Sequence, residues 1–200
     1  ANIQVLKPSS HTWSTFLTHG NLLSIGNQVA VTAIIAIAMT MVIITAGIDL
    51  SVGSLMALSG VLAAWTIHQV AGDGTPSMMT LVGACFIAIL LSAAIGVFTG
   101  IMVTAFDIPA FIVTLAVMRI ARGLAYKIAD GPSPIGIESE SFHSLSAGAL
   151  IGIPNPVILM VLLYIFAYIL MSHTALGRYI YAVGGNPEAA RLSGVPVKRV

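Results

Sequence analysis

The sequence contains few charged residues. Asp, Glu, Lys and Arg make up 8% of its 200 residues, whereas they make up about a quarter of a soluble domain. Eight basic and seven acidic side chains leave a formal net charge of +1. Nucleic acid is not an expected partner, because a phosphate backbone is bound by clustered Lys and Arg side chains, and this chain has too few of them.

Cysteine is nearly absent too. The only one, Cys85, lies inside an apolar run, so the sequence holds neither a disulfide framework nor the cysteine set of a zinc site. The five histidines stand near the ends of apolar runs and lack the spacing of metal ligands. No metal site is expected on this chain.

Apolar residues take the place of the missing charge. Hydrophobic residues make up 58% of the sequence, and its mean hydropathy is +1.00. A helix needs about 20 residues to cross a bilayer, since each residue adds about 1.5 Å. The sequence therefore predicts an all-α fold, a polytopic helical transmembrane bundle that forms one domain over residues 1–200. Five runs suit a crossing: residues 29–46, 50–70, 79–106, 108–129 and 156–172.

The distribution of charge orients the predicted bundle. The linker 130–155 holds Asp130, Glu138 and Glu140 and no Lys or Arg, whereas the segment 173–200 is basic. Because positive residues favour the cytoplasmic side, the segment 173–200 is expected in the cytoplasm and the linker on the opposite side. The junctions between runs at Asp49 and Asp107 then face the cytoplasmic half.

Asp49 is the only charged residue in the stretch 28–70. In one interpretation, Gly47 ends a helix in a left-handed conformation and Asp49 caps the next helix, accepting from the amides of Ser51 or Val52. In the other, a broken helix pair at membrane depth lines a transport path or its gate, which makes Asp49 and Ser51 candidate path residues. The two interpretations can coexist.

Two arginines lie inside the fourth run. Arg119 and Arg122 are three residues apart, so they share one helical face, and an arginine within a membrane-spanning helix is a candidate functional residue. They are the second pair of path candidates. The alternative is that both, with Lys127, extend towards the outer membrane surface or pair with acids on helices outside this chain.

The cytoplasmic segment contains a short helix with defined ends. Asn186 is expected to cap it, Pro187 suits its first turn, and Glu188 lies at its positive end. Gly194 can end it in a left-handed conformation. A helix in a loop accounts for this geometry without any partner.

The same residues carry a resemblance. Glu188, Ala189 and Ala190, followed by Gly194, resemble the EAA loop of ABC importer permeases, whose short cytoplasmic helix docks into a groove of the ATP-binding subunit. Three longer stretches resemble the monosaccharide permeases of the ribose, xylose, arabinose and galactose type: residues 39–60, 108–126 and 174–194. Against that pattern the first crossing and those beyond the EAA loop are missing, so the chain is expected to be a fragment.

The resemblance implies a function and a set of partners. The chain would be the membrane-spanning permease subunit of an ATP-driven importer in the bacterial inner membrane, in contact with membrane lipid. It would work with a second permease subunit, an ATP-binding subunit and a periplasmic sugar-binding protein that delivers a monosaccharide. It would not be an enzyme and would bind no cofactor, because ATP is hydrolysed on the partner. Coupling would involve Asn186, Pro187, Glu188, Ala189, Ala190 and Gly194.

Two other classes compete with this reading. An ion-coupled secondary transporter or channel subunit would use Asp49 as an ion or proton site, but the only other acid near the runs is Asp107, and both suit helix starts. An intramembrane serine hydrolase is a weaker alternative, because the turn around Ser59 lacks the leading glycine of a nucleophile elbow and has no obvious histidine base.

Overall fold

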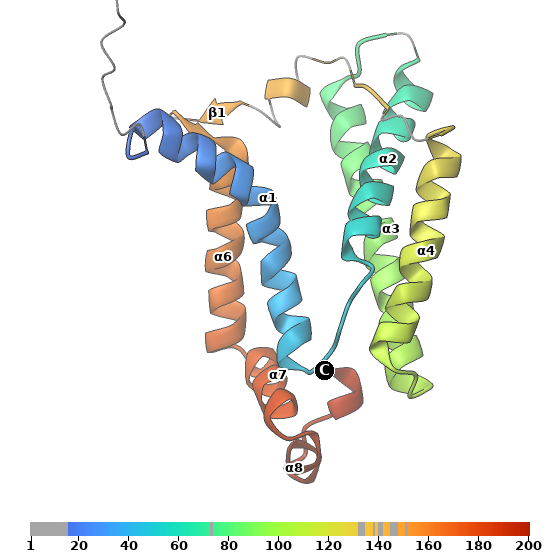
Figure 1. The fold of residues 1–200 in the computed structure, drawn as a ribbon, viewed down its shortest axis with the longest axis vertical. Helices are drawn as coiled ribbons and strands as arrows, with labels where there is room; N and C mark the ends of the chain where they lie inside the picture. The colour runs from blue at the N-terminus through green and yellow to red at the C-terminus, as the bar shows by residue number, and fades with distance from the viewer. Residues whose placement is uncertain are drawn as a thin grey trace, which may run out of the picture.

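The computed structural model describes residues 16–72, 74–131, 135–137, 139, 142–144, 148–150 and 152–200. Glu138 and Glu140, which served to orient the chain, lie outside these residues. Within the described part the predicted all-α class is confirmed: long helices dominate, and the only strands are a pair of two residues each (Figure 1). The elements are α1 His19–Ile44, α2 Val52–Ala71, α3 Met78–Ala105, α4 Ala110–Ile128, β1 Ala149–Leu150, β2 Ile153–Pro154, α6 Asn155–His173, α7 Ala175–Gly185, α8 Pro187–Leu192 and the 3-10 turn η1 Val197–Arg199.

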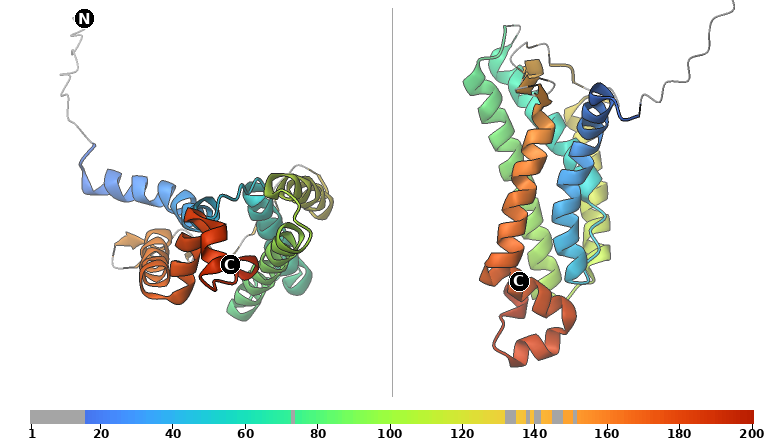
Figure 2. Two further views of the ribbon diagram at one scale, coloured as in Figure 1. Left: turned by 90° about the horizontal axis from the view of Figure 1, so that it is seen from below. Right: turned by 90° about the vertical axis from the view of Figure 1, so that its left-hand side faces the viewer.

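Five long helices occupy the five apolar runs, and α1 departs most from its expected bounds. It begins at His19, ten residues before the run 29–46, because its first turns contain polar residues that hydropathy does not score as a crossing. These turns lie across one end of the molecule before α1 bends to run beside α6 (Figures 1 and 2). The polar start of α1 therefore lies at the end of the bundle opposite α8.

Four of the helices in the described part are long and apolar enough to cross a membrane: α1, α2, α3 and α6. Helix α4 is as long as α6, at 19 residues, but it carries the charged residues Arg119, Arg122 and Lys127. It nevertheless runs alongside α2 and packs against it (Figure 1). A crossing by α4 remains a prediction.

The long helices form two groups. Helices α2, α3 and α4 make a three-helix group. Helix α1 packs against α6, which continues into α7, and these three helices make a second group, the α1–α6 group (Figure 1). The core of the three-helix group consists of small and branched residues at its two interfaces. Leu58, Ala121 and Ala125 are buried between α2 and α4, and Ile67, Leu81 and Ala84 between α2 and α3. Alanines at these interfaces let the helix backbones approach closely.

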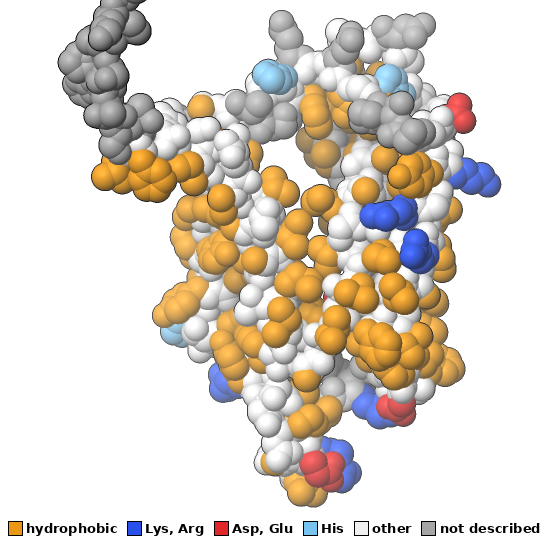
Figure 3. Space-filling model, in the orientation of Figure 1, with side chains coloured by type: hydrophobic (Ala, Val, Ile, Leu, Met, Phe, Trp, Pro, Cys, Tyr) orange, Lys and Arg blue, Asp and Glu red, His pale blue; other side chains and the backbone are white. Residues whose placement is uncertain are grey.

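Large apolar side chains cover most of the outer surface. Helix α6 has no buried residue, and α3 buries only Leu81, Ala84 and Ala88 among its 28 residues. Figure 3 shows hydrophobic side chains over both helix groups, with charged side chains near the ends and on one flank. Lipid chains solvate such surfaces as well as a protein core does, so this distribution suits a bilayer.

Candidate functional site

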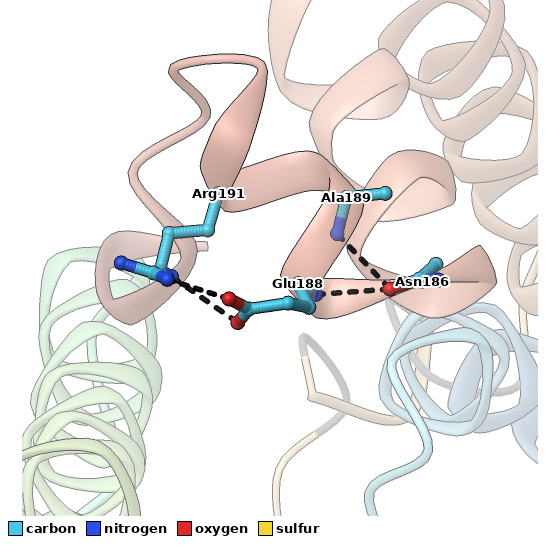
Figure 4. Close-up of polar contacts among 4 residues, drawn as sticks. All are labelled: Asn186, Glu188, Ala189 and Arg191. Atoms are coloured by element: carbon cyan, nitrogen blue, oxygen red, sulfur yellow. Dashed lines mark hydrogen bonds and ion pairs between the residues drawn. The ribbon is translucent and has the colours of Figure 1, made fainter.

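The short helix α8 begins with the expected cap. The Oδ1 atom of Asn186 accepts hydrogen bonds from the backbone N–H groups of Glu188 and Ala189, both at 3.0 Å (Figure 4). Pro187 occupies the first helical position, where a missing N–H costs nothing. The predicted start of the helix is confirmed, and two N–H groups of its first turn have an acceptor.

The end of α8 also matches the sequence prediction. Gly194 has a φ of +84°, and its N–H donates to the carbonyl of Arg191 at 3.0 Å. The N–H of Val195 donates to the carbonyl of Ala190 at 3.0 Å, which completes a Schellman motif. Ala190 is buried at 5% exposure. The motif fixes where the chain leaves the helix.

An ion pair lies on the exposed side of α8. Arg191 donates to Glu188 through Nε to Oε2 at 3.2 Å and through Nη2 to Oε1 at 2.5 Å (Figure 4). The hydrogen bond from Arg191 lowers the pKa of Glu188 and outweighs the opposing effect of desolvation. Both side chains are about two-thirds exposed. Sequence reasoning missed this pair, although its i,i+3 spacing on a helix is the pattern that such pairs follow.

Helix α7 fixes α8 to the end of α1. Its buried face consists of Gly177, Ile180 and Val183, and Thr174 caps it by accepting from the N–H of Gly177 at 3.3 Å. At its other end, a methyl group added to Gly184 would overlap the carbonyl oxygen of Ile44, the last residue of α1. The backbones of α7 and α1 are therefore in direct contact.

The junction between α1 and α2 corrects one prediction. Ala46, not Gly47, takes the left-handed conformation, with a φ of +59°. The N–H groups of Ala46 and Gly47 donate to the carbonyls of Ile43 and Val42, both at 2.9 Å, which closes α1 with a Schellman motif. Glycine is needed at position 47 for space: an added Cβ would lie 2.9 Å from Cγ1 of Val42.

The role of Asp49 at this junction is partly as expected. Its Oδ1 accepts from the N–H of Ser51 at 2.8 Å, which confirms the predicted hydrogen bond, and from the Ser51 hydroxyl at 2.6 Å. The helix position was predicted wrongly, because Ser51 is the N-cap and α2 begins at Val52. Asp49 thus holds the cap residue from two positions upstream, and Ser51 is buried at 1% exposure.

Thr114 joins the same junction to α4. Its hydroxyl lies 3.2 Å from the carbonyl oxygen of Ile48 and 2.9 Å from that of Ala110, one turn back in α4. Thr114 is buried at 3% exposure. Nothing in the sequence marks this contact, because a threonine on a helix usually bonds within its own helix.

The junction between α3 and α4 differs from the sequence prediction. Asp107 does not start α4: the helix begins at Ala110 after Pro109, and Asp107 takes a left-handed φ of +52°. Its Oδ2 lies 3.5 Å from Nζ of Lys198 in the turn η1. Asp107 therefore forms an ion pair with the segment that follows α8 instead of capping a helix.

Arg119 and Arg122 lie apart from these junctions. Both are exposed and lie on α4 opposite the buried face that includes Val113, Val117 and Ala121. Arg119 is the tenth of 19 helical residues, so it lies about 14 Å from the start of α4. No described residue forms a hydrogen bond or ion pair with either side chain. Their role in transport remains a prediction.

Comparison with known proteins identifies the family. Residues 21–200 match the family described as the permease component of the branched-chain amino acid transport system. The chain belongs to this permease family.

Curated relatives of the permease are named as sugar permeases. It is 40% identical to the ribose import permease protein RbsC of Escherichia coli K12 over 92% of its own length and 56% of that protein's. It is 38% identical to RbsC of Bacillus subtilis 168 over 99% and 58% of the two lengths. Identity to the L-arabinose transport system permease protein AraH of E. coli K12 is 39%, over 92% and 53%. The chain spans about half the length of these relatives. No solved structure matches it.

Family membership and the four apolar helices make the permease a multi-pass protein of the bacterial inner membrane. Its described residues contain no group of three or more His, Cys, Asp and Glu side chains that could hold a metal ion.

A hollow of about 270 Å³ lies between α1, α6 and α7, and its lining includes Tyr164, Tyr168 and Tyr181. These aromatic side chains suit the interfacial region of a bilayer.

Proposed function

We propose that this chain belongs to the membrane-spanning subunit of an ATP-driven importer of monosaccharides. The observation that carries the proposal is α8: a short helix with both ends fixed, at the end of the bundle with the basic segment, in a sequence that resembles the EAA loop. An exposed helix that is already ordered suits a groove on an ATP-binding subunit, because little conformational entropy is then lost on binding.

The surface of α8 supports docking. Leu192 is 77% exposed, which leaves a large apolar side chain at the end of the helix beside the ion pair of Glu188 and Arg191. An apolar anchor surrounded by charged groups is a common arrangement in protein interfaces. In this proposal Asn186, Pro187 and Gly194 maintain the helix. The small exposed side chain of Ala189 leaves room for close approach, and Ala190 packs against the rest of the chain. The ATP-binding subunit hydrolyses ATP, and the chain itself binds no cofactor.

The named relatives suggest the substrate class. The relatives are a ribose permease, an L-arabinose permease and a D-allose permease, and all three sugars are neutral monosaccharides. A periplasmic sugar-binding protein would deliver such a sugar, and a second permease subunit would complete the path. Asp49 and Ser51 are proposed gate residues, because they fix the break between two helices at the cytoplasmic end. Arg119 and Arg122 are proposed path residues on α4.

The test reconstitutes the permease that contains this sequence in proteoliposomes with its ATP-binding subunit and sugar-binding protein. Uptake of labelled ribose, arabinose and allose is followed together with ATP hydrolysis. We expect uptake that needs internal ATP and hydrolysis that rises when the loaded binding protein is added. Leu192→Asp should weaken binding of the ATP-binding subunit. Uptake driven by an ion gradient without ATP would overturn the proposal in favour of a secondary transporter.

A further inference from the structure

We infer that two contacts transmit movement of the coupling segment, residues 174–200, to the three-helix group. The first joins Gly184 of α7 to Ile44 at the end of α1, and the second joins Lys198 of η1 to Asp107 between α3 and α4. The inference deepens the proposed function, on which it rests. It assigns positioning roles in coupling to four residues outside the docking helix.

The first contact is between backbones and leaves no room for slippage. Gly184 meets the carbonyl group of Ile44 so closely that a Cβ atom would overlap both its oxygen and its carbon. Ile180 and Val183, both under 9% exposed, hold α7 in this position. A displacement of α8 that pushes α7 towards α1 would therefore move the end of α1, because close-packed interiors have low compressibility and transmit strain.

The residues after Ile44 are held at each step. Ala46 and Gly47 close α1 with two hydrogen bonds of 2.9 Å each. The next carbonyl, that of Ile48, lies 3.2 Å from the Thr114 hydroxyl of α4. Asp49 then fixes Ser51, the buried cap of α2. The junction of residues 45–51 has no long flexible stretch, so movement at Ile44 reaches both α2 and α4.

The second contact reaches the three-helix group directly. Lys198 pairs with Asp107 at 3.5 Å, and η1 packs against α3. Both side chains are more than two-thirds exposed, so a single pair of this kind contributes little to stability. The pair matters because of where it lies. It joins the segment after α8 to the α3–α4 junction, which lies at the same end of the bundle as the α1–α2 junction (Figure 1).

These contacts matter because the helix groups otherwise pack within themselves. The extensive contacts are those of α2 with α3 and α4 on one side, and of α1 with α6 on the other. Figure 1 shows the two groups side by side, with α7 and α8 below α1 and α6 and the C-terminal turn near the lower end of the three-helix group. An element that touches both groups can change their relative position, which is the movement that an alternating-access transporter needs.

The first experiment compares Gly184→Ala with Gly185→Ala in the complete reconstituted transporter. The same methyl group at Gly185 would meet nothing within 4 Å, so this variant controls for the change of residue type at the end of α7. The quantity measured is the number of ATP molecules hydrolysed per sugar imported. We expect Gly184→Ala to raise it by about threefold or more and Gly185→Ala to leave it unchanged.

The second experiment reverses the charges of the ion pair. Lys198→Asp and Asp107→Lys should each raise the number of ATP molecules hydrolysed per sugar, and the double variant should restore it. Both side chains are exposed, so the charge reversals carry the test if Gly184→Ala fails to assemble. Asp107→Asn removes the charge but keeps a residue type that accepts the left-handed φ of +52°, so it controls for the backbone at this position. Binding of the ATP-binding subunit is measured for every variant and is expected to stay as in the unmodified permease, since none of these residues lies in α8.

The two experiments distinguish failure of the transmission route from failure of the proposed ATP-driven import. If Gly184→Ala and both single charge reversals transport with unchanged coupling, the transmission route is overturned while ATP-driven import stands. If the unmodified transporter shows no ATP-dependent uptake, the proposed function fails first and this inference fails with it. Rescue by the double charge reversal supports the route, because a purely local loss of stability would not be restored by exchanging the two charges.

Discussion

The carboxylate of Asp49 accepts two hydrogen bonds from Ser51 through a single oxygen, Oδ1, at 2.8 Å from the backbone nitrogen and 2.6 Å from the hydroxyl. Ser51 is almost fully buried, so both of its donors depend on this partner. The carboxylate of Asp49 therefore has a structural role at the α1–α2 junction, separate from any role in transport.

Replacing Asp49 should show which property of the side chain matters. Asp49→Asn keeps an acceptor oxygen and should be mild, whereas Asp49→Leu leaves the buried Ser51 donors without a partner, at a cost of about 1 to 3 kcal/mol. Thermal unfolding of the purified permease measures the difference. Equal losses of stability in both variants would contradict the structural role.

Gly47 should tolerate no side chain. A Cβ atom there would lie 2.9 Å from Cγ1 and 3.1 Å from the carbonyl oxygen of Val42. We expect Gly47→Ala to destabilise the permease by about 1 to 3 kcal/mol, as overpacking commonly does. Gly53→Ala is the matched control, because a methyl group at Gly53 would meet nothing within 4 Å. Similar melting temperatures for the two variants would refute this account.

The cap of α8 should control how well the helix docks. Asn186→Ala removes the acceptor of two backbone N–H groups and should cost about 1 kcal/mol of helix stability. Asn186→Asp retains the acceptor and should behave like the unmodified chain. The measurement is the affinity of the purified permease for its ATP-binding subunit. A loss of affinity in the aspartate variant equal to that in the alanine variant would argue against capping.

The end of α8 should discriminate among side chains at position 194. Its φ of +84° is unfavourable for residues with a Cβ, by roughly 1 to 2 kcal/mol, and asparagine tolerates it best. We expect Gly194→Asn to retain more coupled transport than Gly194→Val. The number of ATP molecules hydrolysed per sugar is the readout, and the reverse order would be inconsistent with a left-handed end.

Acid should weaken the ion pair on α8. Arg191 lowers the pKa of Glu188 from its usual value near 4.5, so the pair is complete at neutral pH. Because the folded pKa is the lower one, the contribution of the pair is present above the usual value and is lost as the pH falls through the lowered one. Titration of Glu188 by NMR should show this pKa rising towards the usual value in Arg191→Gln. An unchanged pKa would rule out the pair.

Local motifs in the sequence predicted the two ends of α8 well, because these depend on neighbouring residues. Asn186 and Gly194 set the ends of α8 through hydrogen bonds within a few positions, so their residue types were sufficient. Gly47 was assigned the left-handed conformation because glycine favours it, but the space beside Val42 decided its place, and Ala46 took the unusual φ.

Contacts between distant parts of the chain could not be predicted from the sequence. The bond from Thr114 to Ile48 spans 66 positions and involves a backbone carbonyl, which no residue type reveals. Asp107 is a residue type that often caps the start of a helix, and the sequence placed it just before a predicted one. Its partner Lys198 comes near it only in the folded chain. The apolar runs predicted the helices but not their grouping, because lipid-facing and protein-facing sides have similar hydropathy.

No residue of α6 is buried, so the thickness of the surrounding membrane bears on the position of the helices that follow it. Nineteen residues span about 28 Å, close to the hydrocarbon layer of a typical bilayer. Helix α6 packs against α1 and α7 through partly buried side chains, so a tilt or shift of α6 that matches a thinner or thicker layer would move these helices with it. Since α7 and α8 follow directly from its end, lipids of different chain length would change how far α8 projects from the bundle.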